Sequence, residues 1–179
     1  MNLIPRWGRR WTGALLGASL LVLSGCGYAL VGRASNLPAD IKNVYIKPLE
    51  NRTPRSQVEQ SVTRAIADEM VRRHRFSVVG SPEGADAELS GAVVAFGVTP
   101  VTFDPSGRAT EYEIALTAQI IFKRTGQETP IWSNDRYTFR ETYPIDATSA
   151  NYVDLEDAAI DRAAERFAET MVSDLLEGF

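Results

Sequence analysis

The strongest constraint on the fold is the alternation between Tyr112 and Phe122, the cleanest in the chain, in which apolar residues are opposed by Glu111, Glu113, Thr117 and Gln119. Successive side chains of a β-strand point to opposite faces, so this pattern predicts a strand with one apolar and one polar face. The apolar positions are Tyr112, Ile114, Leu116, Ala118, Ile120 and Phe122. A strand of this kind belongs in a sheet that is covered by an apolar layer on one side.

Three further strands are predicted over residues 41–47, 87–96 and 131–143. The strand at 41–47 is indicated by alternation of apolar and polar residues. The strand at 87–96 is indicated by a dense run of valine and alanine, and the strand at 131–143 by recurring aromatic residues. The turn-forming segments Asp104-Pro105-Ser106-Gly107 and Thr125-Gly126-Gln127 separate the last three strands of the chain. Both turns are short, so we expect these three strands to be antiparallel neighbours joined by hairpins.

Two amphipathic helices are predicted from apolar residues at helical spacing. The first runs from about Thr53 to Arg73, starts at a possible capping box in Ser56-Gln57-Val58-Glu59, and is followed by a short apolar run from Phe76 to Val79. The second runs from about residue 151 to residue 176. The apolar stripes are Val58, Val62, Ile66 and Met70 in the first helix and Ile160, Ala163, Phe167, Met171 and Leu175 in the second.

The element order is therefore β-α-β-β-β-α, which indicates the α+β class. A right-handed crossover makes the first two strands parallel, so the predicted sheet is four-stranded and mixed, with both helices packed on one face. The other face must meet a partner or solvent. Tyr137, Phe139 and Tyr143 alternate with polar residues, and such a half-polar, aromatic-bearing face suits either environment.

The first 25 residues are predicted to be a lipoprotein signal peptide. Arg6, Arg9 and Arg10 precede an apolar run from about Trp11 to Leu23, which is too short for a permanent membrane helix. The run ends in Leu23-Ser24-Gly25-Cys26, which resembles a lipobox. The alternative is an ordinary secretory signal with a chance cysteine. We expect Cys26 to carry a covalent lipid at the N-terminus of the mature protein.

Three parts follow from this interpretation: the signal peptide at 1–25, a lipidated N-terminus and linker at 26–40, and a single domain at 41–179. Gly27, and not aspartate, follows Cys26. By resemblance to lipoprotein sorting in Gram-negative bacteria, this favours the outer membrane, with the chain lipid-anchored on its periplasmic side. The linker spans at most about 50 Å when fully extended. Such a short linker favours a partner at the membrane.

Composition excludes several classes of function. Without the signal peptide, 16 Lys and Arg face 23 Asp and Glu, a net charge of −7, so no attraction to nucleic acid is expected. Cys26 is the only cysteine, and once lipidated it leaves no thiol for a disulfide or metal site. The only histidine, His74, lies at the end of a predicted helix and is expected to cap it. No catalytic or metal-binding motif is found, so we expect neither an enzyme nor a cofactor beyond the lipid.

Four arginines are predicted to gather at one end of the sheet. In the predicted topology the first strand ends there, the 104–108 turn lies there, the last strand ends there, and both helices begin there. The arginines are Arg52, Arg55, Arg108 and Arg140. Arginines and helix N-termini both favour anions, so this end is a candidate site for phosphate or carboxylate groups. The alternative is that each arginine only solubilises the surface.

Five short segments, in this order, resemble the LptE family of lipopolysaccharide-assembly lipoproteins. They are Cys26-Gly27-Tyr28-Ala29-Leu30-Val31-Gly32, Leu37-Pro38, Glu50-Asn51-Arg52-Thr53, Gly107-Arg108-Ala109-Thr110-Glu111-Tyr112 and Asp161-Arg162-Ala163-Ala164-Glu165-Arg166. The resemblance implies two helices on a four-stranded sheet that plugs the outer-membrane β-barrel protein LptD and assists its assembly. It also implies contact with lipopolysaccharide through basic residues near the tip of the domain, and a role in inserting lipopolysaccharide into the outer leaflet.

At the tip this chain departs from the family pattern. Asp104 and Pro105 precede the glycine where relatives can carry a basic residue, and residues 146–157 contain no lysine or arginine. The resemblance therefore supports partnership with the barrel more than contact with lipopolysaccharide. A function from another class remains open, namely a periplasmic lipoprotein that regulates a cell-wall synthase or another envelope enzyme.

Overall fold

The computed structural model describes residues 37–144 and 152–177, and of residues 152–156 only the backbone. The described residues all belong to one compact unit. The predicted signal peptide, Cys26 and most of the predicted linker lie outside the described residues, so their boundaries remain predictions.

The chain forms six strands and two helices in the described residues, and the α+β class is confirmed. The elements are β1 (Asn43–Ile46), β2 (Glu50–Asn51), α2 (Val58–Arg72), β3 (Ser77–Val79), β4 (Ala87–Phe103), β5 (Ala109–Arg124), β6 (Pro130–Pro144) and α3 (Tyr152–Glu177). The prediction of four strands is wrong, because β2 and β3 also join the sheet. Strands of two and three residues are too short to show an alternating pattern, so periodicity could not reveal them.

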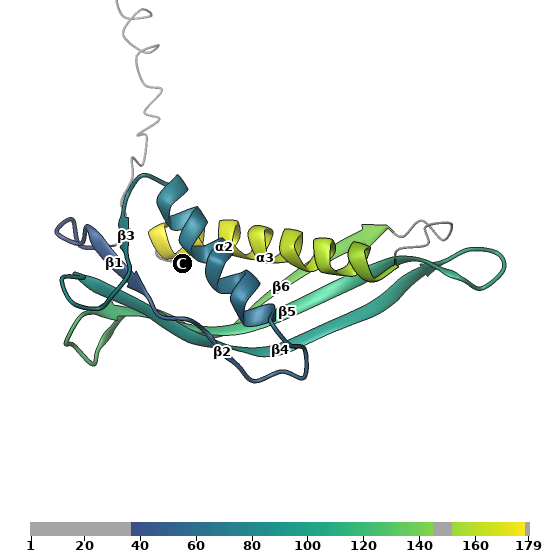
Figure 1. Ribbon diagram of the computed structural model, residues 1–179, viewed down its shortest axis with the longest axis horizontal. Coiled ribbons are helices and arrows are strands. Elements are labelled where there is room, and N and C mark those ends of the chain that lie inside the picture. Colours follow the sequence, from purple (N-terminus) through teal and green to yellow (C-terminus); the bar gives the residue numbers. More distant parts are fainter. Residues whose placement is uncertain (1–36, 145–151, 178–179) are drawn as a thin grey trace, which may run out of the picture. The chain divides into compact units, whose positions relative to one another are not determined.

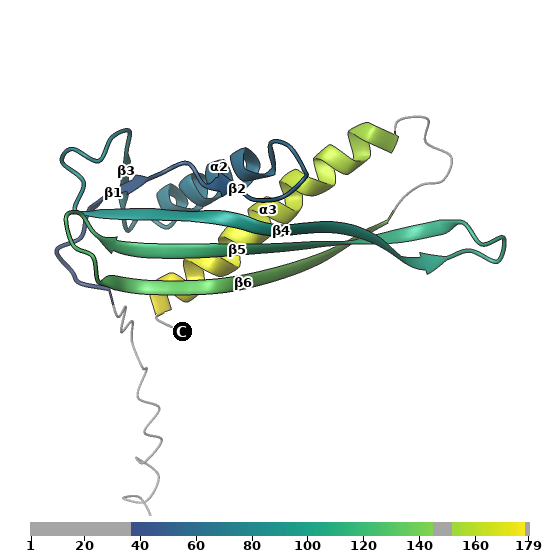
Figure 2. The same cartoon turned by 90° about the horizontal axis from the view of Figure 1, so that it is seen from below.

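The sheet has the order β3-β1-β4-β5-β6, with β2 also paired to β4. Strand β1 is parallel to both β3 and β4, as the crossover prediction requires. Strands β4, β5 and β6 are antiparallel neighbours, which confirms the two predicted hairpins. Figure 2 shows these three long strands running side by side.

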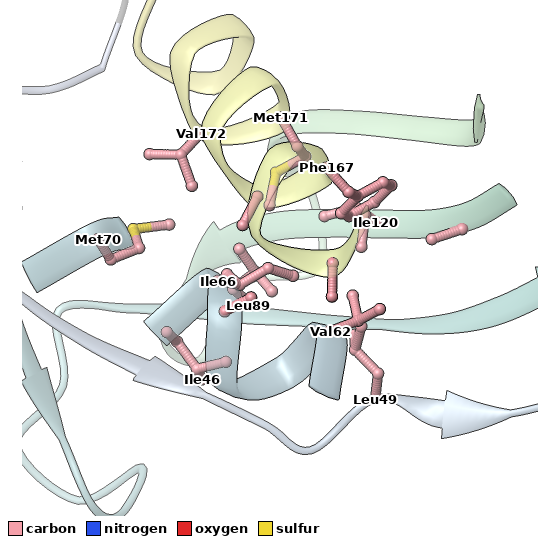
Figure 3. Packing of buried hydrophobic residues seen from close by; sticks show 14 of the residues in the cluster. Ile46, Leu49, Val62, Ile66, Met70, Leu89, Ile120, Phe167, Met171 and Val172 are labelled. Carbon is pink, nitrogen blue, oxygen red and sulfur yellow. The ribbon is translucent and has the colours of Figure 1, made fainter. Parts of the chain in front are cut away.

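Both helices lie on the same face of the sheet, as predicted (Figure 1). Figure 3 shows side chains of the two predicted apolar stripes meeting above the sheet, among them Ile66 of α2 and Phe167 of α3. Both of these side chains are completely buried, and so is Ile120 of β5 beneath them. Burial of a large apolar side chain contributes about 1.5–3 kcal/mol, so this shared core supplies most of the driving force for folding.

The aromatic residues of β6 belong to the covered face, which corrects the suggestion that they face a partner or solvent. Tyr137 pairs with Ala118 and Phe139 pairs with Leu116, and directly opposite residues of antiparallel strands share a face. The Tyr137 ring meets the Phe167 ring edge to face at 5.4 Å. The face without a helix instead carries residues such as Thr138 and Arg140.

Helix α2 begins at Val58, later than the predicted start near Thr53, and the predicted capping box does not form. The residue before the helix, Gln57, has a φ of 68° and makes no side-chain cap. Glu59, the acid of the expected box, instead accepts a hydrogen bond of 2.7 Å from the Asn51 side chain. The segment before α2 is therefore tied to β2 and not to the helix start.

Helix α2 ends at a backbone turn around His74. This residue has a φ of 52°, the left-handed conformation that often ends a helix, and its N–H donates to the Val71 carbonyl at 3.0 Å. The predicted position of His74 at the helix end is thus found, and the backbone makes the capping contact.

Candidate functional site

The long strands extend into an arm at one end of the domain. Beyond Val93, where pairing with β2 stops, β4 has no outer neighbour among the described residues. Beyond the level of Pro144, β4 and β5 are the only strands of the sheet in the described residues, and they end in the narrow loop that projects in Figure 1. We call residues 101–110 the tip hairpin. Val101 and Phe103 are exposed there by 48% and 57%, which gives an apolar surface to this projection.

Asp104 organises the turn of the tip hairpin. Its Oδ1 accepts hydrogen bonds from the Ser106 hydroxyl at 2.6 Å and from the backbone N–H groups of Ser106 and Arg108 at 2.8 and 3.0 Å. Its Oδ2 meets Nε of Arg108 at 3.1 Å. The Ser106 hydroxyl, followed by the Arg108 N–H, holds the pKa of Asp104 well below its usual range. Asp104 therefore stays ionised and fixes the backbone from which Arg108 projects.

This role of Asp104 was not predicted from the sequence, where Asp104 counted only as the absence of a basic residue. The signal that could have revealed it is the order Asp-Pro-Ser-Gly, because an aspartate at the start of a turn commonly accepts the N–H two residues later. Gly107 completes the turn with a φ of 81°. The tip is thus a defined loop with an outward arginine.

The four predicted site arginines do not gather at one point, and that part of the prediction is wrong. Arg52 donates its N–H to Val93, whereas Arg108 lies beyond the pair formed by Phe103 and Ala109. Val93 and Phe103 are ten positions apart on β4, or about 30 Å at ~3.3 Å per residue. Arg140 lies between these levels, opposite Ala115. The reason is that β4 continues to Phe103 instead of ending near Phe96 as predicted.

Each of the four arginines has a carboxylate partner. The pairs are Arg52 with Glu50 at 2.8 Å, Arg55 with Asp157 at 2.7 Å, Arg108 with Asp104 at 3.1 Å and Arg140 with Glu113 at 2.6 Å. Arg108 is the most exposed, with 70% of its side chain accessible, and Arg55 the least, with 37%. Exposed ion pairs contribute little to stability, so an incoming phosphate can compete for these guanidinium groups.

The face of the sheet that carries no helix is polar and hydrogen-bonded across the strands. Arg52 reaches the Gln119 side chain at 3.5 Å, and Gln119 donates to Asp135 of β6 at 3.3 Å. The hydroxyls of Thr117 and Thr138 lie 3.1 Å apart. This face presents ordered donors and acceptors and few large apolar groups, so it suits contact with another polar surface.

A concave region of ≈650 Å³ lies where α2 begins beside α3. Arg55 and Arg64 line it together with Asp157 and Asp161, and the Ser61 hydroxyl donates to Asp161 at 2.7 Å. Two cations facing two carboxylates leave little net charge, so this groove has no clear preference for an anion.

No group of three or more His, Cys, Asp or Glu side chains in residues 37–144 and 157–177 is placed to hold a metal ion. Neither of the two described helices combines the length and hydrophobicity needed to cross a membrane. What the surface offers is the arm with Arg108 and the polar open face.

The geometry thus defines an α+β domain built for contact, with one covered face, one open polar face and a projecting hairpin. A model of the LptE family, described as lipopolysaccharide-assembly, matches residues 41–175. The chain therefore belongs to the LptE family, which confirms the resemblance seen in the sequence and places the chain among proteins of lipopolysaccharide assembly.

Solved structures share the fold at low sequence identity. A putative lipoprotein from Caulobacter crescentus CB15 is 16% identical and aligns over 73% of this chain and 88% of its own, with a TM-score of 0.50. The hypothetical protein CT253 from Chlamydia trachomatis is 9% identical and aligns over 75% of this chain and 95% of its own, with a TM-score of 0.51. A search of curated protein sequences gave no match.

Proposed function

We propose that this chain is a non-catalytic outer-membrane lipoprotein that partners and plugs the LptD β-barrel. In this role it assists the transport of lipopolysaccharide, binds it, and helps its insertion into the outer leaflet. A lipid on Cys26 holds the domain on the periplasmic side of the outer membrane. Membership of the LptE family over residues 41–175 is the observation that carries the proposal.

The open face of the sheet supports a polar partner such as the lumen of a barrel. Outer-membrane barrels have polar interiors, whereas their apolar residues face lipid. The Thr117–Thr138 contact and the Arg140–Glu113 pair give this face ordered polar groups that a polar wall can match. The helix-covered face of the sheet offers less surface to a partner, because its central apolar residues are already buried in the core.

The tip hairpin supports contact with lipopolysaccharide, whose lipid part carries both phosphate groups and acyl chains. Arg108 offers a guanidinium to phosphate, and the exposed side chains of Val101 and Phe103 lie on the same projection. Arg140 is the next exposed arginine along the arm. Arg52 and Arg55 lie farther from the tip and act, in this proposal, as secondary anion contacts.

Depletion of the chain from its own cells tests the proposal. We expect lipopolysaccharide at the cell surface to fall, because the transporter lacks its plug and the barrel assembles poorly. Wild-type protein should restore surface lipopolysaccharide, measured by labelling intact cells, while a Cys26→Ala variant that cannot be lipidated should restore it poorly. Normal surface lipopolysaccharide in depleted cells would contradict the proposal.

A further inference from the structure

A groove of ≈660 Å³ lies at the end of the domain opposite the tip hairpin, beside the first described residues. It runs between the C-terminal end of α2, strand β3 and the segment before β1. Its lining includes Ala39, Lys42, Val71, His74, Arg75 and Phe76. None of the lining residues is an aspartate or glutamate, although the chain as a whole is acidic.

The groove combines apolar and cationic groups. Val71 is 53% exposed, which makes it one of three large apolar side chains exposed in the described part of the chain. The Arg75 guanidinium carbon lies 5.7 Å from the centre of the Phe76 ring, and its Nη2 donates to the Leu37 carbonyl at 3.4 Å. Lys42 and His74 are exposed beside it. The surface of the groove is therefore amphipathic, unlike an ordinary polar surface that meets only water.

The acids nearest this groove, Asp40 and Asp86, already have hydrogen-bond or ion-pair partners. Asp40 pairs with Arg124 at 2.8 Å. Asp86 accepts the backbone N–H groups of Asn43 and Lys42 at 2.8 and 2.9 Å, and these two bonds keep its pKa below the usual range. Lys42 and Arg75 make no ion pair within the described residues, so their charges are available to an external anion.

Glu69 explains why the neighbouring arginines do not add to this patch. Its buried carboxylate pairs with Arg72 at 3.1 Å and with Arg73 at 2.5 Å. Both guanidinium groups are thus paired with a carboxylate of α2, unlike Lys42 and Arg75 of the groove.

The position of the groove along the chain limits how far it can be from a lipid anchor. Leu37 is buried and lies two residues before Ala39 of the lining. Cys26 precedes Leu37 by eleven positions. Even a fully extended segment of this length reaches only about 35–40 Å, and a coil reaches less. A lipid on Cys26 therefore keeps the groove close to the bilayer surface.

We propose that this groove docks on the membrane and takes the phosphate groups of anionic phospholipids. Lys42 and Arg75 bind headgroup phosphates, and Val71 enters the interfacial layer beside them. The inference rests on the lipid anchor of the proposed function but needs neither LptD nor lipopolysaccharide. Docking at two points, the lipid and the groove, would fix the orientation of the domain relative to the membrane.

A fluorescent probe at the groove tests this docking. The lipid on Cys26 occupies the only native thiol, so Val71→Cys gives a single site for an environment-sensitive dye. The lipidated chain, whose lipid is first verified by mass spectrometry, is placed in vesicles of phosphatidylcholine with or without phosphatidylglycerol. We expect blue-shifted emission and quenching by brominated acyl chains only with phosphatidylglycerol. Glu165→Cys, on the exposed side of α3 and outside both proposed sites, is the matched control and should give solvent-exposed emission in both vesicles.

Charge neutralisation tests the role of the cations. Each basic residue near an anionic bilayer changes membrane partitioning about fivefold, so Lys42→Gln with Arg75→Gln should weaken docking of the labelled chain about 25-fold. Arg162→Gln with Arg166→Gln, on the exposed side of α3, should leave docking unchanged. High salt should also move the labelled groove away from the membrane when Lys42 and Arg75 are intact, since salt screens charges at the surface.

Three results would overturn the inference. One is a dye at position 71 that reports the same environment with and without phosphatidylglycerol. Another is docking that survives both the double substitution and high salt. The last is a chain without lipid on Cys26, because nothing would then hold the groove at the membrane. A failure of barrel or lipopolysaccharide binding leaves these vesicle measurements unaffected, so the two proposals can fail separately.

Discussion

Asp104 and Arg108 are bound to each other three times at the tip of the arm. The Asp104 N–H donates to the Arg108 carbonyl at 2.8 Å, and the Asp104 carboxylate accepts the backbone N–H of Arg108 at 3.0 Å and its Nε–H at 3.1 Å. The bonds to the backbone of Arg108 fix the turn, and the bond to Nε holds the guanidinium in a pair that stays accessible to solvent. The tip is therefore ordered before any ligand arrives, and an anion has only to replace one exposed carboxylate contact.

The first prediction concerns Arg108 and Arg140, the two exposed arginines of the arm. Arg108→Gln with Arg140→Gln should weaken binding of purified lipopolysaccharide at least about tenfold, because two charge-assisted contacts to phosphate are lost. The thermal midpoint of unfolding should change little, as expected for exposed positions. Arg162→Gln with Arg166→Gln is the matched control. Unchanged binding by the arm variant would restrict the domain to plugging and assembly.

The second prediction concerns the contact between β6 and α3. The Tyr137 hydroxyl donates to Asp174 Oδ2 at 2.5 Å, so Tyr137→Phe should lower the free energy of unfolding by about 1 kcal/mol. Burial, with help from Asp174, raises the pKa of Tyr137 to about 12 from an ordinary value of 10. A raised pKa stabilises the folded state below pH 10, and this contribution is lost as pH rises through 12. Denaturant unfolding at several pH values should show a steeper loss between pH 10 and 12 in the wild type than in Tyr137→Phe.

The third prediction concerns the close approach of β4 to β5 at Gly91. A Cβ built on Gly91 would lie 2.0 Å from the carbonyl oxygen of Gln119, which is backbone and cannot move aside alone. Gly91→Ala should therefore destabilise the domain by about 3 kcal/mol or more. Gly97→Ala in the same strand has no atom within 4 Å of the new Cβ and should cost little. Equal midpoints for the two variants in chemical unfolding would argue against the β4–β5 register.

The fourth prediction concerns the end of α2. His74 has a φ of 52°, where a residue with a Cβ is strained, so His74→Gly should stabilise the domain by about 1 kcal/mol. Arg73 has an ordinary helical φ of −70° and pairs with the buried Glu69 carboxylate, so Arg73→Gly should destabilise instead for both reasons. The free energy of unfolding in urea distinguishes the two cases, and a loss of stability in His74→Gly would contradict the left-handed conformation.

Much of the buried face of the domain could be predicted from the sequence. The alternation from Ile114 to Phe122 and the stripe that contains Phe167 identified side chains that are buried in the structure. These patterns arise because side chains that face one apolar core recur at every second residue in a strand and every three to four residues in a helix. The parallel pairing of β1 with β4 followed from the handedness of crossovers.

The arrangement of the candidate site could not be predicted in the same way. The end of β4 near Phe103 is exposed on both sides and shows no alternation, so its length was underestimated and Arg108 was placed beside Arg52. The partners of the arginines depend on the register between strands. The register of β5 and β6 brings Arg140 close to Glu113, and local sequence does not reveal such a pairing. Asp104 was missed for a different reason, namely that its side chain acts on its own turn.

The central claim, partnership with the LptD barrel, is tested most directly by purifying the lipidated chain from detergent-solubilised outer membranes under native conditions. The amount of LptD that comes with it is then quantified by mass spectrometry. Near-equal molar amounts of the chain and LptD are the predicted result. Recovery of the chain without any barrel protein, from membranes that contain LptD, would contradict the account.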